Sequence, residues 1–170
     1  MQKFKLKKNL ILSLLSIFTI GLFAQNKNPN DYVNKFVSLP YISVHTVPDS
    51  SIFSTKKLPK NTSFLLMFFS PDCDHCHQQT KELIAYKKEL KGVKILLLSV
   101  APYQEIKKFY KEFGLASVSN IKVGQDVNFK LGITYKVSTY PSIFLYDRRA
   151  ILAKAFVGNI GVPAILDAIK

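Results

Sequence analysis

Two short apolar runs, separated by one segment of helical periodicity, constrain the fold of this chain more than any other feature. The runs SFLLMFFS and VKILLLSV occupy residues 63–70 and 93–100. Strands that are apolar throughout are typical of positions buried on both faces of an α/β sheet. Between the runs, apolar residues recur at the spacing of one helix face, and Gly92 supplies a helix stop. The pattern therefore predicts a strand, a helix and a second buried strand.

The rest of the chain continues the alternation of strands and helices. Residues 42–47 alternate moderately and predict an edge strand, followed by a loop. An apolar stripe predicts a second helix that is opened by Pro102 and closed by Gly114. The later elements are a short strand, a short helix, a hairpin and a closing helix, at residues 121–123, 126–131, 142–158 and 162–170. This order predicts one α/β domain with mixed strand directions.

The composition excludes several classes of protein. A chain of 170 residues that is 48% apolar is long and apolar enough for a sizeable core, which excludes a disordered chain. Two cysteines are too few for a disulfide scaffold. The formal net charge is +13, but the lysines are scattered rather than gathered in a stripe with aromatic residues. This distribution predicts a solvated basic surface and no nucleic-acid partner.

The N-terminus has the pattern of an export signal. Four lysines lie within the first eight residues, and Leu10–Ala24 follows without a charge. This apolar run of about 15 residues is typical of a secretory signal and shorter than the roughly 20 residues of a spanning helix. The predicted organisation is a signal peptide at 1–24, a leader at 25–40 and a domain at 41–170. The protein is expected in the periplasm or otherwise exported; the alternative is an uncleaved segment that anchors it facing the periplasm.

The two cysteines stand together as Cys73-Asp74-His75-Cys76, directly after a buried strand and at the start of a helix. Unpaired N–H groups and the positive end of the helix dipole are expected to stabilise a thiolate on Cys73. Cys76 lies one turn further along, where it is shielded but able to attack a mixed disulfide at Cys73. The pair can therefore exchange disulfides with another protein through a covalent intermediate.

The segment FFSPDCDHC after a strand, Tyr140-Pro141 ahead of the strand SIFLYD, and the order of elements resemble the thioredoxin superfamily, in particular its exported TlpA/ResA-like branch. The resemblance implies a thioredoxin fold, with a mixed central sheet flanked by helices, an N-terminal strand extension, and a strand and helix inserted before a cis proline. It also implies that Pro141 is the cis proline and that the backbone of Tyr140 pairs with the substrate chain. The implied partners are protein thiols or disulfides and a membrane redox protein, with no organic cofactor.

Residues around the cysteines give conflicting signals on the direction of electron flow. His75 stabilises a thiolate and so favours an oxidant of the DsbA type, whereas Asp74 opposes a neighbouring thiolate. The sequence also departs from thioredoxin itself, because Asp72 stands where thioredoxin has Trp and Met67 where it has a buried acid. The TlpA-like features favour a reductant, and the DsbA-like oxidant stays as the alternative.

Other interpretations of the motif remain to be tested. A binding module without catalysis could keep the same fold with a structural disulfide, or with a metal held by the cysteines, His75 and His77. We favour no metal, and we expect His77 to face solvent and Asp126 to cap a helix.

Overall fold

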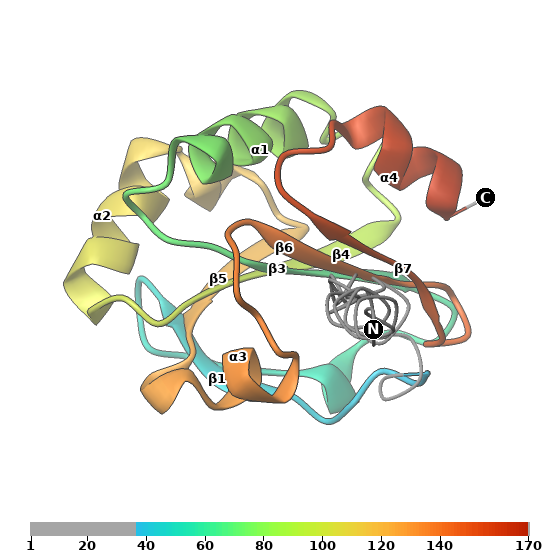
Figure 1. The fold of residues 1–170 in the computed structure, drawn as a ribbon, viewed down its shortest axis with the longest axis horizontal. Helices are drawn as coiled ribbons and strands as arrows, with labels where there is room; N and C mark the ends of the chain where they lie inside the picture. Colours follow the sequence, from blue (N-terminus) through green and yellow to red (C-terminus); the bar gives the residue numbers. More distant parts are fainter. Residues whose placement is uncertain (1–36, 170) are drawn as a thin grey trace, which may run out of the picture.

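The structure is a computed structural model that describes residues 37–169, and its centre is a sheet of seven strands in the order β2-β1-β5-β4-β3-β6-β7 (Figure 1). The strands are β1 Ser43–Val47, β2 Ile52–Ser54, β3 Ser63–Phe68, β4 Val93–Ser99, β5 Ile121–Gln125, β6 Ser142–Tyr146 and β7 Leu152–Val157. The α-helices are α1 Asp74–Ala85, α2 Tyr103–Glu112, α3 Lys130–Thr134 and α4 Val162–Ala168. Three short 3-10 helices lie between them: η2 Thr55–Lys57, η3 Leu115–Ser117 and η4 Val127–Phe129.

The two apolar runs form the middle of the sheet. Strand β3 pairs parallel with β4, in register from Ser63 opposite Val93 to Phe68 opposite Leu98, and β4 pairs parallel with β5. On the other side β3 pairs antiparallel with β6, which forms the predicted hairpin with β7. Every residue of β3 is buried, since helices or loops cover the strand on both faces. The structure thus confirms the predicted α/β domain with a mixed sheet.

Alternate residues of the central strands build two separate apolar cores. On one face, Met67 and Leu97 pack with residues from α1, α2 and α4, whereas on the other face Leu66 and Leu96 pack with Tyr135 after α3 and with residues before β1. Figure 1 shows α1, α2 and α4 together on one side of the sheet and α3 on the opposite side. The period of two along each strand is what divides the side chains between these cores.

Two predictions of secondary structure need correction. Strand β1 is not the edge of the sheet, because β2, in a segment predicted to be a loop, pairs with it and occupies the edge. A three-residue strand carries too little periodicity to be recognised, and its hairpin pairing with β1 is what forms it. The first helix ends at Ala85, and residues 86–92 continue as turns rather than as helix up to Gly92.

The predicted signal peptide, and the predicted leader up to residue 36, lie outside the described residues. The last residues of that leader lie against the β6–β7 hairpin, where the N–H of Leu39 donates to the carbonyl of Ala150 at 2.8 Å. Ser38 forms an isolated bridge with Ile151. None of the helices between residues 37 and 169 has the length and apolar character needed to cross a membrane.

Candidate active site

Cys73 lies at the junction between the central strand and the helix that follows it. After β3, the N–H of Phe69 still bonds to the Leu98 carbonyl at 2.9 Å, which fixes where the chain leaves the sheet. Cys73 is the N-cap of α1, and its Sγ accepts a hydrogen bond from the N–H of Cys76 at 3.3 Å. A sulfur in this position lies among the unpaired N–H groups of a helix start, where negative charge is stabilised.

The two cysteines differ sharply in their access to solvent. Both are free thiols in the structure; Cys73 is half-buried, whereas Cys76 has an exposed fraction of 0%. Burial raises the pKa of the Cys76 thiol, and the hydrogen bond with Cys73 raises it further. Cys73 is therefore accessible from outside, whereas Cys76 is shielded and its thiol stays protonated.

Tyr140 and Pro141 lie beside Cys73 in the fold, although they are far away in the sequence. The Tyr140–Pro141 peptide bond is cis, as the resemblance implies. The thiol of Cys73 points to the carbonyl oxygen of Tyr140, with the sulfur 3.7 Å from that oxygen. The structure thus brings together the pair of cysteines and the dipeptide that the sequence analysis selected.

Asp126 is a buried acid near the same end of the sheet. Its carboxylate accepts hydrogen bonds from the N–H groups of Leu131 at 3.0 Å and Gly132 at 2.7 Å, so it binds the start of α3 and serves the expected capping role. Burial raises the pKa of Tyr140, and the negative charge of Asp126 raises it further. The sequence did not indicate that Asp126 lies close enough to Tyr140 to affect the pKa of its hydroxyl group.

The charged residues around Cys73 face water. Asp72, Asp74 and His75 are all exposed, and within residues 37–169 none of them takes part in an ion pair. Water screens charges in such positions, so each can change the stability of a nearby thiolate only modestly.

The prediction that His77 faces solvent is wrong. Its ring packs against Phe109 of α2 and Phe113 directly after it, with centroid distances of 5.6 and 5.2 Å. Its Nε2 donates a hydrogen bond to the carbonyl of Pro71. The histidine therefore joins the loop before Cys73 to two helices. The sequence signal was the pair Phe109 and Phe113, four residues apart on α2, but nothing in the sequence showed which residue packs against them.

The residues around the cysteines offer little to a metal ion. In the part of the chain that the structure describes, no three His, Cys, Asp or Glu side chains come together as a candidate metal site. His77 already uses its Nε2 on the Pro71 carbonyl. Met67 is fully buried in β3. An apolar side chain therefore lies in the core at the position where the resemblance implies an acid.

Comparison with known proteins agrees with this arrangement. A family described as Thioredoxin-like matches residues 61–150. The Thioredoxin-like protein SkfH of Bacillus subtilis (strain 168) is 28% identical over 114 residues, which cover 65% of this chain and 79% of SkfH.

Solved structures share the fold at lower identity. StoA from Bacillus subtilis superimposes with a TM-score of 0.62 at 16% identity, covering 78% of this chain and 98% of that one. The exposed lipoprotein thioredoxin Etrx1 from Streptococcus pneumoniae gives 0.62 at 24% identity, covering 75% and 96%. A secreted disulfide oxidoreductase from Mycobacterium tuberculosis gives 0.63 at 14%, covering 75% and 92%. These likenesses confirm the thioredoxin fold.

Proposed function

Because the chain belongs to this thioredoxin-like family, we propose that it is an exported thiol-disulfide oxidoreductase that exchanges disulfides with other proteins through Cys73 and Cys76. One observation carries the proposal: a half-buried Cys73 caps a helix, a fully buried Cys76 lies one turn behind it, and the Tyr140 carbonyl lies 3.7 Å from the first sulfur. A structural disulfide would have no need for this difference in access.

The proposed reaction uses the two sulfurs in turn. The Cys73 thiolate attacks one sulfur of a client disulfide, so a Cys73–client bond forms and the client's other sulfur leaves as a thiolate. Cys76 then gives up its proton and attacks Cys73, which forms the Cys73–Cys76 disulfide and releases the second client thiol. The client gains two electrons and two protons, and the oxidoreductase loses the same number.

The client chain is proposed to align on the backbone beside Cys73. The Tyr140 carbonyl lies next to the sulfur, and an extended client strand would pair with the backbone at that residue. The buried Cys76 would then be the only thiol within reach of the mixed disulfide. This positioning would make the resolving step faster than attack by an outside thiol.

We propose the direction of a reductant. The exposed His75 provides only a screened favourable charge for the thiolate, and the equally exposed Asp72 and Asp74 oppose it. Without a strong stabilisation of the reduced form, the disulfide is not a strong oxidant. An exported reductant also needs a source of electrons, and we propose a membrane redox protein for that role.

The export proposal rests on the sequence of the first 24 residues. Their basic start and uncharged run are typical of a secretory signal. Cleavage is the proposed outcome, with anchoring by an uncleaved segment as the alternative.

The test is the reduction of insulin by the protein that lacks residues 1–24, with dithiothreitol as electron source. We expect turnover by the natural sequence and none above background with Cys73→Ala, whereas Ser117→Ala, a change far from the cysteines in the sequence, should leave the rate unchanged. Equal rates for the natural sequence and Cys73→Ala would contradict the proposal. Titration against glutathione gives the direction: a potential nearer that of thioredoxin than that of DsbA supports a reductant.

A further inference from the structure

A hollow lies at the end of the sheet opposite to the cysteines. It has a volume of about 360 Å³ and lies between β2, η2 and the first residues of β4 and β5. This volume is within the roughly 300–1,000 Å³ of pockets that hold small molecules. Along β4, the residues from Lys94 to Leu98, next to the cysteine loop, span roughly 13 Å. The hollow is therefore separate from the active site.

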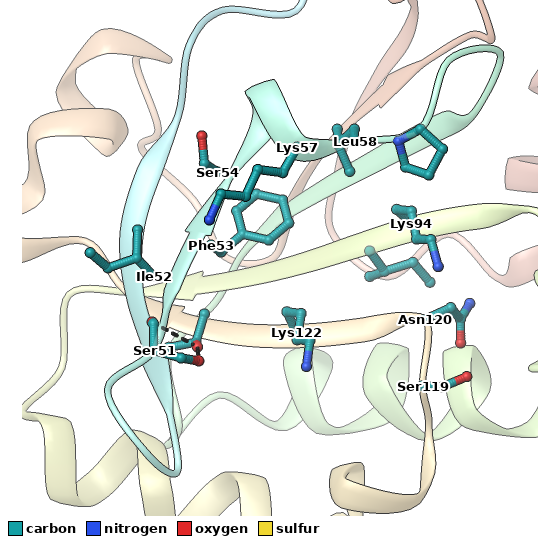
Figure 2. A pocket seen from close by; sticks show the side chains of 13 residues that line it. Ser51, Ile52, Phe53, Ser54, Lys57, Leu58, Lys94, Ser119, Asn120 and Lys122 are labelled. Atoms are coloured by element: carbon teal, nitrogen blue, oxygen red, sulfur yellow. Dashed lines mark hydrogen bonds between the residues drawn. The ribbon is translucent and has the colours of Figure 1, made fainter.

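Three lysines from three different segments line this hollow, which we name the basic pocket. Lys57 comes from η2, Lys94 from β4 and Lys122 from β5, and Figure 2 shows them at separate positions around the pocket. The only ion pair within residues 37–169 joins Arg149 to Asp147, so no carboxylate of the described chain pairs with these lysines. Three like charges that share one hollow repel one another, and a bound anion relieves that repulsion.

The carboxylate that could balance this positive charge interacts only weakly with the lysines. Asp49 is fully exposed; hydrogen bonds from Ser51 lower its pKa first, and Lys122 adds only the last contribution. Asp49 does not line the pocket, whereas Ser51 does. The basic pocket thus keeps an excess of positive charge.

Lys94 is the most informative of the three lysines. It lies in the central strand β4, opposite Phe64 of β3, and the next residues on its face of the sheet are the fully buried Leu96 and Leu98. A half-buried lysine on an otherwise apolar face raises the free energy of the fold unless its charge has a partner or reaches water. Because this lysine lines the pocket, a ligand bound there can contact its ammonium group.

The other side chains of the basic pocket are apolar, carry hydroxyl groups or, at Asn120, carry an amide. Phe53, Leu58 and Ile95 supply the apolar part, and Ser51, Ser54 and Ser119 supply hydroxyl groups. The Phe53 ring is fixed by stacking on Phe64, with centroids 6.0 Å apart and an interplanar angle of 14°. A purely inorganic ion would leave this apolar surface uncovered.

We propose that the basic pocket binds a small organic anion, with its phosphate or carboxylate group near Lys57, Lys94 and Lys122 and its apolar body against Phe53 and Leu58. The site requires no change in Cys73 or Cys76. It therefore goes beyond disulfide exchange and does not depend on it.

Phenyl phosphate is the probe for this proposal, with inorganic phosphate and benzyl alcohol as the two halves of its chemistry. In a ¹H–¹⁵N correlation spectrum of the protein without residues 1–24, phenyl phosphate should shift the amides of residues 51–58, 94 and 119–122. Each half-probe should bind at least about tenfold more weakly, because each lacks one set of contacts. Absence of shifts at about 10 mM phenyl phosphate, or equal binding of inorganic phosphate, would overturn the proposal.

The matched variants are Lys94→Met and Lys107→Met, since both lysines are half-buried and Lys107 lies on α2 away from the pocket. Lys94→Met should weaken phenyl phosphate about tenfold, whereas Lys107→Met should change it less than about twofold. Lys122→Gln, at an exposed position, is the second variant in case Lys94→Met does not fold. Equal affinity in the folded Lys94 or Lys122 variant would contradict the assigned site.

A lipid headgroup offers the same anion as a soluble phosphate ester. Vesicles of phosphatidylglycerol separate the two sources, because a pocket for small molecules should give the same sedimentation with the natural sequence and Lys94→Met. Sedimentation that is lost in Lys94→Met would overturn the assignment to a soluble ligand.

Discussion

The two ends of the central sheet carry different chemical groups, which different segments of the chain supply. At the end where β3 leads into α1, the reacting groups come from four consecutive residues, and one of the two sulfurs is fully buried. At the other end, the lysines of the basic pocket come from three segments and keep their charge in contact with water. The two cysteines of the candidate active site lie within one short segment, whereas the basic pocket exists only after the sheet has formed.

This comparison leads to different expectations for the two ends. Substitutions of Cys73, Cys76 and Asp126 at the cysteine end should change reactivity or stability strongly, since these side chains are buried or bound to backbone groups. Substitutions of the pocket lysines should leave both nearly unchanged and alter only binding. A substitution at one end that changed the properties of the other end would contradict this comparison.

The largest expected effect is a difference in alkylation between the two thiols. At neutral pH, iodoacetamide should modify Cys73 at least about a hundredfold faster than Cys76, because Cys76 is fully buried and its pKa is raised. Peptide mass spectrometry after short labelling measures both rates. Urea should abolish the difference, and Lys94→Met should preserve it; comparable native rates would contradict the assigned roles.

A smaller effect is expected at the buried carboxylate of the cysteine end. Asp126→Asn leaves one oxygen for the two N–H donors of Leu131 and Gly132, so the free energy of unfolding should fall by about 2 kcal/mol. Urea denaturation measures the change. Asp49→Asn, at the exposed position near Lys122, is the control and should leave the midpoint unchanged; an equal loss in both variants would remove the contrast between the two ends.

The raised pKa of Cys76 predicts how the stability of the reduced protein depends on pH. The folded state holds the Cys76 proton above the usual thiol pKa of 9.0, while the unfolded chain releases it there. Stability is therefore lost as pH rises above that value, by about 1 kcal/mol at one pH unit beyond it. Cys76→Ser cannot lose this proton, so thermal unfolding from pH 7 to 10 should show a shallower decline; identical slopes would contradict the buried, protonated thiol.

The smallest effect concerns the exposed histidine between the cysteines. His75→Pro removes a positive group near the thiolate and should lower the reduction potential by about 10–30 mV, since the charge is screened by water. Proline is tolerated in the first turn of α1. Equilibration with glutathione measures the potential. His77→Pro cannot serve as a control, because the ring of His77 packs against aromatic side chains at α2. An unchanged or higher potential would remove the tuning role from His75.

Much of the fold could be predicted from the sequence because its strongest signals are local. The runs of β3 and β4 are buried on both faces, so nearly every residue carries the apolar signal, with Lys94 as the exception in β4. The two cysteines, their place after a strand, and the turn to a helix also lie within one short segment. The contact of Tyr140 with Cys73 came only from the resemblance, since no local pattern links residues so far apart.

The features that the sequence could not reveal depend on long-range contacts. The three-residue strand β2 exists because β1 pairs with it, and the burial of His77 depends on aromatic residues of α2. The lysines of the basic pocket look like ordinary surface charges along the chain. Only the sheet brings Lys94 and Lys122 next to η2, and only the register of β4 shows that Lys94 interrupts an apolar face.

The most direct test of the central claim is to trap the mixed disulfide. Reduced Cys76→Ser protein, mixed with a protein that contains a disulfide, should form a covalent one-to-one adduct whose linkage maps to Cys73, and the natural sequence should release the same client as free thiols. Absence of that adduct, or the same adduct with Cys73→Ser, would contradict the account.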